Sequence, residues 1–331
     1  MAGRRQKKSG RRSYAWRYRG RIVACVFVEV IIICALVIMI GWNKGVKEWF
    51  EQFEQPVLKE VDISGINSPN AILMQARGGK ILGEINGEAQ IYPASMTKIM
   101  TVILGIENFD DLDEKITLTD EMFTGLYEQD ATQAGFQPGE EVRVIDLLYG
   151  AMLPSGAECC IALADTISGS EADFAELMNK KARKLGMENT HFCDSTGLHN
   201  PDHYSTVKDI AVLMKYCIKN DTFREIVETS RHSTGVTNIH PDGITYYSTM
   251  FKNLSDPTVT GGKILGGKTG YTSEAGHCLV SFAEIEGREY IFVSAGASGA
   301  DGNTIPHIQD AVTVYNRVGA AIEEKMNDNN K

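Results

Sequence analysis

The 331-residue sequence lacks the cysteine patterns that mark disulfide-rich domains and Cys-rich zinc sites. It has seven cysteines, none of them in a C-x-x-C spacing, and the five beyond residue 42 are an odd number. A domain of this size has little need of a disulfide framework. We therefore expect free thiols that act as small buried apolar side chains at Cys159, Cys160, Cys193, Cys217 and Cys278.

The sequence also has no H-E-x-x-H motif, the helical ligand pair of many zinc peptidases. Ligand-type side chains do gather in the stretch HFCDSTGLHNPDHYST, at His191, Asp194, His199, Asp202 and His203. A zinc hydrolase would need three of them together with a general base. The glycine, asparagine and proline of this stretch predict a loop instead. We expect polar loop and helix-capping residues beside a site, and neither a metal nor an organic cofactor.

Acidic residues are missing from the first 21 positions, which hold nine of the chain's 33 Lys and Arg, so the remainder is strongly acidic. Residues 22–42 form an apolar run broken only by Glu29, long enough for a membrane-spanning helix. No small-residue cleavage site follows it. By the positive-inside rule we predict a single-pass cell-membrane protein with a cytoplasmic tail (1–21), an anchor (22–42), a spacer (43–65) and an extracellular domain (66–326).

Aromatic residues lie among the basic ones at Tyr14, Trp16 and Tyr18, a combination that can bind nucleic acid. The acidic remainder of the chain would repel a phosphate backbone. Basic and aromatic residues are also typical of the flank of a membrane anchor. We therefore expect this segment to have the membrane as its partner, and no nucleic acid.

The stretch GGKILGGKTGYT, residues 261–272, fits two different motifs. Gly262 and Gly267-Lys268-Thr269 have Walker A spacing, in which a strand leads into a phosphate-binding loop and a helix. Lys268-Thr269-Gly270 is also the K-T-G triplet of serine acyl-transfer enzymes. No sustained apolar run precedes this stretch, and the residues after it alternate as in a strand. The sequence therefore favours acyl transfer.

The acyl-transfer interpretation requires an upstream Ser-x-x-Lys at a helix start, and YPASMTKIMT supplies Ser95 and Lys98. Residues three apart share a helix face, so the Lys98 amine can lie beside the Ser95 hydroxyl. A serine hydroxyl is a weak nucleophile until a neighbouring base takes its proton. Lysine can act as that base only when neutral, which burial and a second cation such as Lys268 would favour.

The order of the expected elements predicts an α+β domain. A hairpin over residues 71–86 precedes a helix from Ser95 to about Asn108, and residues 117–185 are predicted to be mostly helical. Later strands are divided by tight turns, and a last helix covers about His307 to Met326. This order favours an antiparallel sheet with helices, plus an all-helical part, rather than a βαβ arrangement.

Four segments together resemble the signature segments of one family: YPASMTKIMT, LLYGAMLPSGAE, GMENTHFCDSTGLHNPDHYSTVKDIAVL and GGKTGYTSEAGHCLV. They are similar to those of the D-alanyl-D-alanine carboxypeptidases of peptidase family S11, low-molecular-mass penicillin-binding proteins of the serine beta-lactamase-like superfamily. The resemblance runs from about Asn70 to Ile322. It implies the transpeptidase-like fold and a serine hydrolase that removes the terminal D-alanine from peptidoglycan stem pentapeptides, in cell-wall biosynthesis and cell shape.

By this resemblance Ser95 attacks the carbonyl of the penultimate D-alanine and forms an acyl-enzyme. Lys98 takes the proton of Ser95, and Ser155 relays a proton towards the leaving D-alanine. Beta-lactam antibiotics would inhibit the enzyme covalently.

The same resemblance implies a substrate-binding strand. Lys268 and Thr269 would hold the terminal carboxylate, because a cation and a hydroxyl donor suit that anion. Gly270 would let the substrate backbone approach the strand edge. The N–H groups of Tyr271 and Ser95 would form the oxyanion hole.

One position departs from the family pattern: the usual Ser-x-Asn is Ser155-Gly156-Ala157 here, so a side-chain amide near Lys98 is missing. Water or a neighbour such as Glu158 could fill that place. Three alternatives stay open. The first is a penicillin-binding wall scaffold with weak or no peptidase activity, and the second is an enzyme in which transpeptidation outweighs hydrolysis. The third is a beta-lactamase, although class A members would carry an E-x-x-L-N loop that this sequence lacks.

Overall fold

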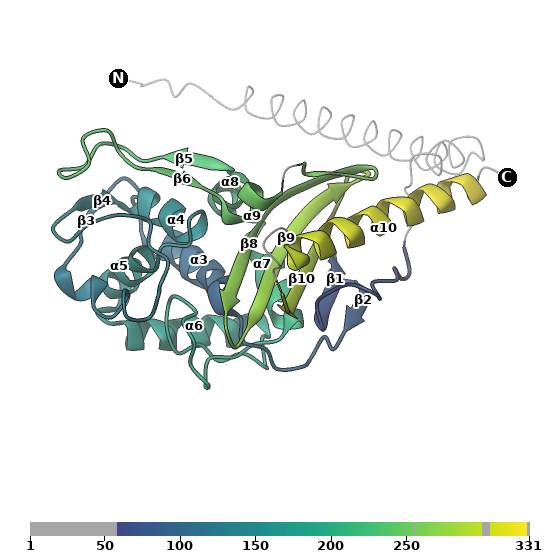
Figure 1. Cartoon of the computed structure of the whole chain (residues 1–331), viewed down its shortest axis with the longest axis horizontal. Helices are drawn as coiled ribbons and strands as arrows, with labels where there is room; N and C mark the ends of the chain where they lie inside the picture. Colours follow the sequence, from purple (N-terminus) through teal and green to yellow (C-terminus); the bar gives the residue numbers. More distant parts are fainter. Residues whose placement is uncertain (1–57, 255, 300–304, 330–331) are drawn as a thin grey trace, which may run out of the picture. The chain divides into compact units, whose positions relative to one another are not determined.

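The computed structural model describes residues 58–254, 256–299 and 305–329, and within them a six-stranded antiparallel sheet (Figure 1). Its strand order is β2-β1-β10-β9-β8-β7. The strands are β1 (Asn70–Gln75), β2 (Ile81–Ile85), β7 (Thr258–Val259), β8 (Gly262–Thr272), β9 (Gly276–Ile285) and β10 (Arg288–Ala297). The two-residue β7 pairs only with the beginning of β8. Within the described part, the rest of the β8 edge is therefore free of a strand partner.

Helices cover both faces of this sheet, because successive side chains of a strand point to opposite faces. On β9, Leu279 belongs to the apolar core beneath α10 (Pro306–Asn329). Its neighbour Val280 belongs to the opposite core, which α7 (Val207–Cys217) and α8 (Asp221–Glu228) cover. The sheet is thus the middle of three layers, with α10 lying across one face (Figure 1).

The second core continues into a helical part built around α3 (Lys98–Asn108), which is buried from Lys98 to Gly105. A helix that is apolar on all sides needs neighbours all round. Those neighbours include α4 (Val144–Met152), α5 (Ala157–Ser168) and α6 (Glu171–Leu185). The remaining elements are short: 3₁₀ turns η1 (Ala94–Thr97) and η2 (Asp120–Phe123), helix α9 (Thr249–Asn253), and the pairs β3 (Lys115–Thr117) with β4 (Glu141–Arg143) and β5 (Arg231–Ser233) with β6 (Thr245–Tyr247).

The predicted α+β class, the early hairpin, the antiparallel sheet and the last helix are confirmed. The expectation that residues 117–185 are mostly helical is wrong for residues 117–143, which form the last residue of β3, a 3₁₀ turn, loops and β4. Three glycines there, Gly125, Gly135 and Gly139, adopt positive φ. Such φ values break a right-handed helix, so helix α4 begins only at Val144.

The packed domain begins earlier than the sequence predicted. Leu58, Val61 and Ile63, which were expected in the spacer, are buried in the core beneath α10. The predicted anchor and tail lie outside the described residues. Within the described residues, no helix is both long and apolar enough to span a bilayer.

Candidate active site

Ser95 lies in the 3₁₀ turn η1, directly before the buried helix α3. Its neighbours Ala94, Met96 and Thr97 are buried, whereas Ser95 is partly exposed. Ala94 adopts φ 47°, a left-handed conformation that a residue with a Cβ rarely takes. Strain of this kind often gathers at functional sites. The turn therefore presents one hydroxyl, that of Ser95, to the space outside α3.

Lys98 lies one turn beyond Ser95, as its spacing predicted. The Lys98 Nζ is 3.0 Å from Ser95 Oγ and donates to the Thr196 carbonyl oxygen at 2.7 Å. The Lys98 side chain is only 3% exposed. Burial lowers the pKa of Lys98, although Cys160, Asp194 and Glu158 oppose this shift. A neutral amine at this distance can accept the proton of the Ser95 hydroxyl.

A second serine–lysine pair faces the same cavity. Lys268 of β8 donates to Ser155 Oγ at 3.0 Å, across 113 positions of sequence. Ser155 lies between α4 and α5 with φ 72°, another left-handed residue that is not glycine. Lys268 is 1% exposed. Burial, together with the nearby charge of Lys98, holds the pKa of Lys268 well below its usual value.

The K-T-G triplet lies within an extended strand rather than in a loop before a helix. Strand β8 runs from Gly262 to Thr272 and pairs with β9 throughout. This geometry rules out the Walker A interpretation, which requires a phosphate-binding loop at a helix N-terminus. A Cβ on Gly270 would lie 3.1 Å from the Ser95 backbone nitrogen. The strand therefore runs close against the turn that carries Ser95.

Side chains from separate elements line a cavity of about 470 Å³. Five of the predicted residues line it: Ser95, Ser155, Thr269, Gly270 and Tyr271. Lys98 and Lys268 do not line it but contact the serines that do. A hydroxyl nucleophile, a buried base and a second hydroxyl–amine pair around one cavity can carry out acyl transfer.

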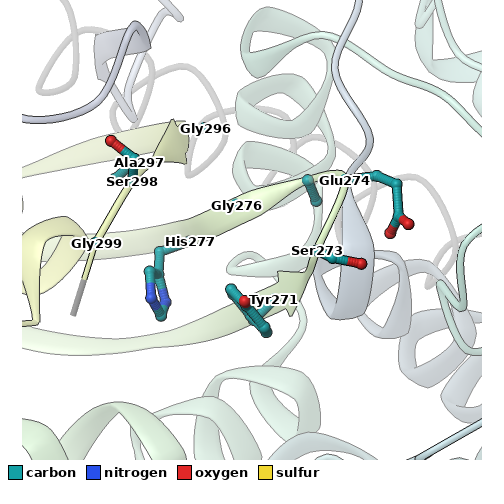
Figure 2. A pocket seen from close by; sticks show the side chains of 10 residues that line it. Tyr271, Ser273, Glu274, Gly276, His277, Gly296, Ala297, Ser298 and Gly299 are labelled. Atoms are coloured by element: carbon teal, nitrogen blue, oxygen red, sulfur yellow. The ribbon is translucent and has the colours of Figure 1, made fainter. Parts of the chain in front are cut away.

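A larger hollow of about 620 Å³ adjoins this cavity at the ends of β8, β9 and β10. Figure 2 shows its lining, with Tyr271 and His277 on neighbouring strands. Their ring centroids are 4.6 Å apart, and the His277 ring stacks on His307 at 5.0 Å. Tyr271 and His277 line both hollows, and Tyr271 is 61% exposed.

Two contributors to the site escaped the sequence analysis. They are the backbone carbonyl of Thr196, which accepts from Lys98, and the Thr249 hydroxyl, which lies 2.7 Å from the Thr269 hydroxyl. His203, which was expected as a polar loop residue beside the site, lies 2.9 Å from Thr97 Oγ1. The stretch that holds Thr196 and His203 is a loop, as predicted. Among the described residues no group of three or more His, Cys, Asp or Glu is arranged to hold a metal ion.

The position of the missing family amide is buried and packed. Ala157 is 1% exposed, and its N–H donates to the Thr132 carbonyl. Glu158 Oε1 accepts from the N–H groups of Ala134 and Gly135. These bonds hold its carboxylate on the neighbouring loop, so Glu158 does not replace the amide as a hydrogen-bond partner of Lys98.

The cysteine prediction is confirmed in part. All five described cysteines are free, and Cys159, Cys160, Cys217 and Cys278 are buried. Burial raises the pKa of each of these four thiols. Cys193 differs, because it is partly exposed.

The fold and the two serine–lysine pairs around one cavity are the features expected of the penicillin-binding class of serine acyl-transfer enzymes. The model of the D-alanyl-D-alanine carboxypeptidase family, peptidase S11, matches residues 57–299. The chain belongs to this family.

Similar proteins agree with this assignment. D-alanyl-D-alanine carboxypeptidase DacF of Bacillus subtilis is 36% identical over 69% of this chain and 57% of its own length. DacC of Escherichia coli is 33% identical over 72% of this chain and 58% of its own. This chain thus spans less than two thirds of these curated relatives. The crystal structure of the Streptomyces K15 DD-transpeptidase matches with a TM-score of 0.69 and 30% identity, over 79% of this chain and 100% of that one.

Proposed function

We propose that this protein is a serine-type D-Ala-D-Ala carboxypeptidase that removes the terminal D-alanine from peptidoglycan stem pentapeptides. The observation that carries the proposal is the Ser95–Lys98 pair, 3.0 Å apart, with the lysine buried and its pKa lowered. A structural lysine on a helix would instead be exposed and charged.

Acylation follows from this pair. Ser95 Oγ attacks the carbonyl carbon of the penultimate D-alanine while Lys98 takes the hydroxyl proton. The N–H groups of Ser95 and Tyr271 stabilise the resulting oxyanion. The close approach of β8 at Gly270 to the Ser95 nitrogen supports this role. The proton then passes through Ser155 to the nitrogen of the departing D-alanine as the C–N bond breaks, and water later releases the shortened peptide.

The substrate's carboxylate pairs with Lys268 and the Thr269 hydroxyl. Burial and the nearby charge of Lys98 destabilise Lys268 as a cation. An anion beside it favours the protonated amine. Substrate binding and protonation of Lys268 therefore support each other, and this coupling selects peptides with a free terminal carboxylate. Beta-lactams carry a carboxylate next to a reactive carbonyl and would acylate Ser95.

Membrane attachment is part of the proposal. The nine basic residues and the apolar run at 22–42 support an anchored enzyme with its catalytic domain outside the cell. A peptidoglycan substrate agrees with that location.

Transpeptidation is the second candidate, because the matched K15 structure is that of a DD-transpeptidase. Both reactions share the acyl-enzyme and differ in whether water or an amine accepts the acyl group.

The test is covalent labelling of the full-length chain in detergent with a fluorescent penicillin, beside a Ser95→Ala variant. We expect label on the wild type, at Ser95 by mass spectrometry, and none on the variant. A D-Ala-D-Ala tripeptide, with and without added D-amino acid, then separates hydrolysis from exchange. A folded wild-type protein that takes no label would favour the scaffold alternative. Rapid turnover of a chromogenic cephalosporin would favour a beta-lactamase.

A further inference from the structure

A single carboxylate, that of Asp194, shapes the loop that contacts Lys98. Asp194 Oδ1 accepts from the Thr196 N–H at 2.8 Å, the Thr196 hydroxyl at 2.7 Å and the Gly197 N–H at 2.7 Å. These bonds close a tight turn on the side chain of its first residue. The turn directs the Thr196 carbonyl at Lys98 Nζ, 2.7 Å away.

The same loop packs directly on the turn that carries the nucleophile. Gly197 has φ 81°, and a Cβ there would collide with the Ala94 carbonyl oxygen. His203, which is 2% exposed, bridges the two segments. Its Nδ1 lies 3.1 Å from Asp194 Oδ2, and its Nε2 lies 2.9 Å from Thr97 Oγ1. A buried ring with a partner at each nitrogen holds both segments in one register.

Charged and titratable groups surround Lys98 on several sides. Asp194 approaches from the loop, Glu158, Cys159 and Cys160 approach from α5, and Lys268 approaches from β8. Burial raises the pKa of Cys160 to about 12, so this thiol carries no charge near neutral pH. Burial likewise raises the pKa of Glu158. Hydrogen bonds from His203, Thr196 and Gly197 outweigh burial at Asp194 and lower its pKa to about 2. Asp194 is therefore the carboxylate near Lys98 with the strongest stabilisation of its negative charge.

We propose that Asp194 and His203 are positioning residues for acylation. Asp194 fixes the Thr196 carbonyl beside Lys98 and supplies a negative charge near it. His203 fixes the loop that holds Asp194 to the Ser95 turn through Thr97. This inference rests on the proposed function, because the step it governs is the proton transfer from Ser95 to Lys98. Neither residue contacts the reacting atoms.

The charge of Asp194 is tested by the pH profile of acylation. Rates of labelling by the fluorescent penicillin would be measured for the full-length wild type, Asp194→Asn and Asp202→Asn. Loss of a nearby negative charge favours neutral Lys98, so the acidic limb of the Asp194→Asn profile shifts to lower pH by about one unit. Asp202→Asn removes the same charge from an exposed position of the same loop and leaves the limb in place. An unmoved limb in Asp194→Asn, or an equal shift in both variants, overturns the role of Asp194.

The bridge is tested by partial replacement of the imidazole. In His203→Gln the amide nitrogen can take the place of Nε2 and keep the bond to Thr97. In His203→Asn the shorter side chain can take only the place of Nδ1, so the bond to Thr97 is lost. We expect His203→Asn to slow acylation about tenfold and His203→Gln to restore most of that loss. Thr97→Val should cost as much as His203→Asn, and the double variant should cost no more than either.

Equal rates for the Gln and Asn variants, or additive losses in the double variant, overturn the bridge even if all variants stay folded. A wild type that takes no label overturns the proposed function itself, and with it this role. If the wild type is labelled but the variants change neither the pH profile nor the rate of acylation, only the positioning role of Asp194 and His203 is wrong.

Discussion

Lys268 and Ser155 are in hydrogen-bond contact at 3.0 Å, and Lys98 and Ser95 make a second contact of 3.0 Å at the same cavity. Both lysines are buried, and their charges disfavour each other. Placing two ammonium groups in one buried site lowers the free energy of unfolding, and a site with a purely structural role has no reason to contain both. The two buried lysines therefore lower the stability of the fold, and in return the site keeps a neutral amine beside a serine.

Replacement of Lys98 by methionine should separate activity from stability. Lys98→Met removes the base while keeping the volume, so acylation by penicillin should fall about a thousandfold. Removal of a buried charge should raise the free energy of unfolding by about 1–3 kcal/mol. Denaturant unfolding and labelling rates measure the two effects. Lys208→Met, at an exposed pair with Glu88, should change neither by much; a destabilised but active Lys98→Met would contradict the assignment.

The same lysine predicts an alkaline dependence of stability. The pKa of Lys98 is lower in the folded state than its usual value of 10.5. Between those two values the unfolded chain binds more protons, so the destabilisation by Lys98 is complete below its folded-state pKa and is lost as pH rises to about 10.5. Denaturant unfolding of the wild type and Lys98→Met should be measured from pH 7 to 10. The difference between their free energies of unfolding should shrink as pH rises. A constant difference would mean that Lys98 titrates normally.

Asp194 should make the free energy of unfolding depend on pH at the acidic end of the range. Its pKa is lowered from 3.8 to about 2, so it contributes about 2 kcal/mol above pH 4 that is lost as pH falls through 2. Acid unfolding of the wild type should therefore include a component that Asp194→Asn lacks. Asp202→Asn serves as the exposed control. If the wild type and Asp194→Asn lose stability in parallel between pH 4 and 2, the carboxylate is not held by its hydrogen bonds.

Gly270 predicts a steric effect on the oxyanion hole. A Cβ there would lie 3.1 Å from the Ser95 nitrogen and 3.2 Å from the Pro93 carbonyl oxygen, so Gly270→Ala must push β8 away from the Ser95 turn by a few tenths of an ångström. We expect acylation to slow about tenfold with little change in melting temperature. Gly235→Ala, where the nearest atom is 3.5 Å from the added Cβ, is the control. Full activity in Gly270→Ala would place the oxyanion hole elsewhere.

Local patterns were enough to predict some parts of this protein and not others. The β1–β2 hairpin and α10 follow from turn residues and apolar spacing, which act over a few residues. The stretch at 117–143 was mispredicted because positive-φ glycines interrupt an otherwise helical composition. The boundary near residue 58 could not be seen in the sequence, because Leu58 and Val61 are buried by the distant helix α10.

The sequence by itself determined the pairing of Ser95 with Lys98, because a three-residue spacing on a helix fixes which side chains are neighbours. It also determined the K-T-G strand, through the alternation that follows it. Only the tertiary structure decided that Lys268 meets Ser155 across 113 positions and that Thr196 offers its carbonyl to Lys98. A backbone carbonyl has no signature in the residue types, and the burial that makes a lysine a base exists only once the sheet has packed on α3.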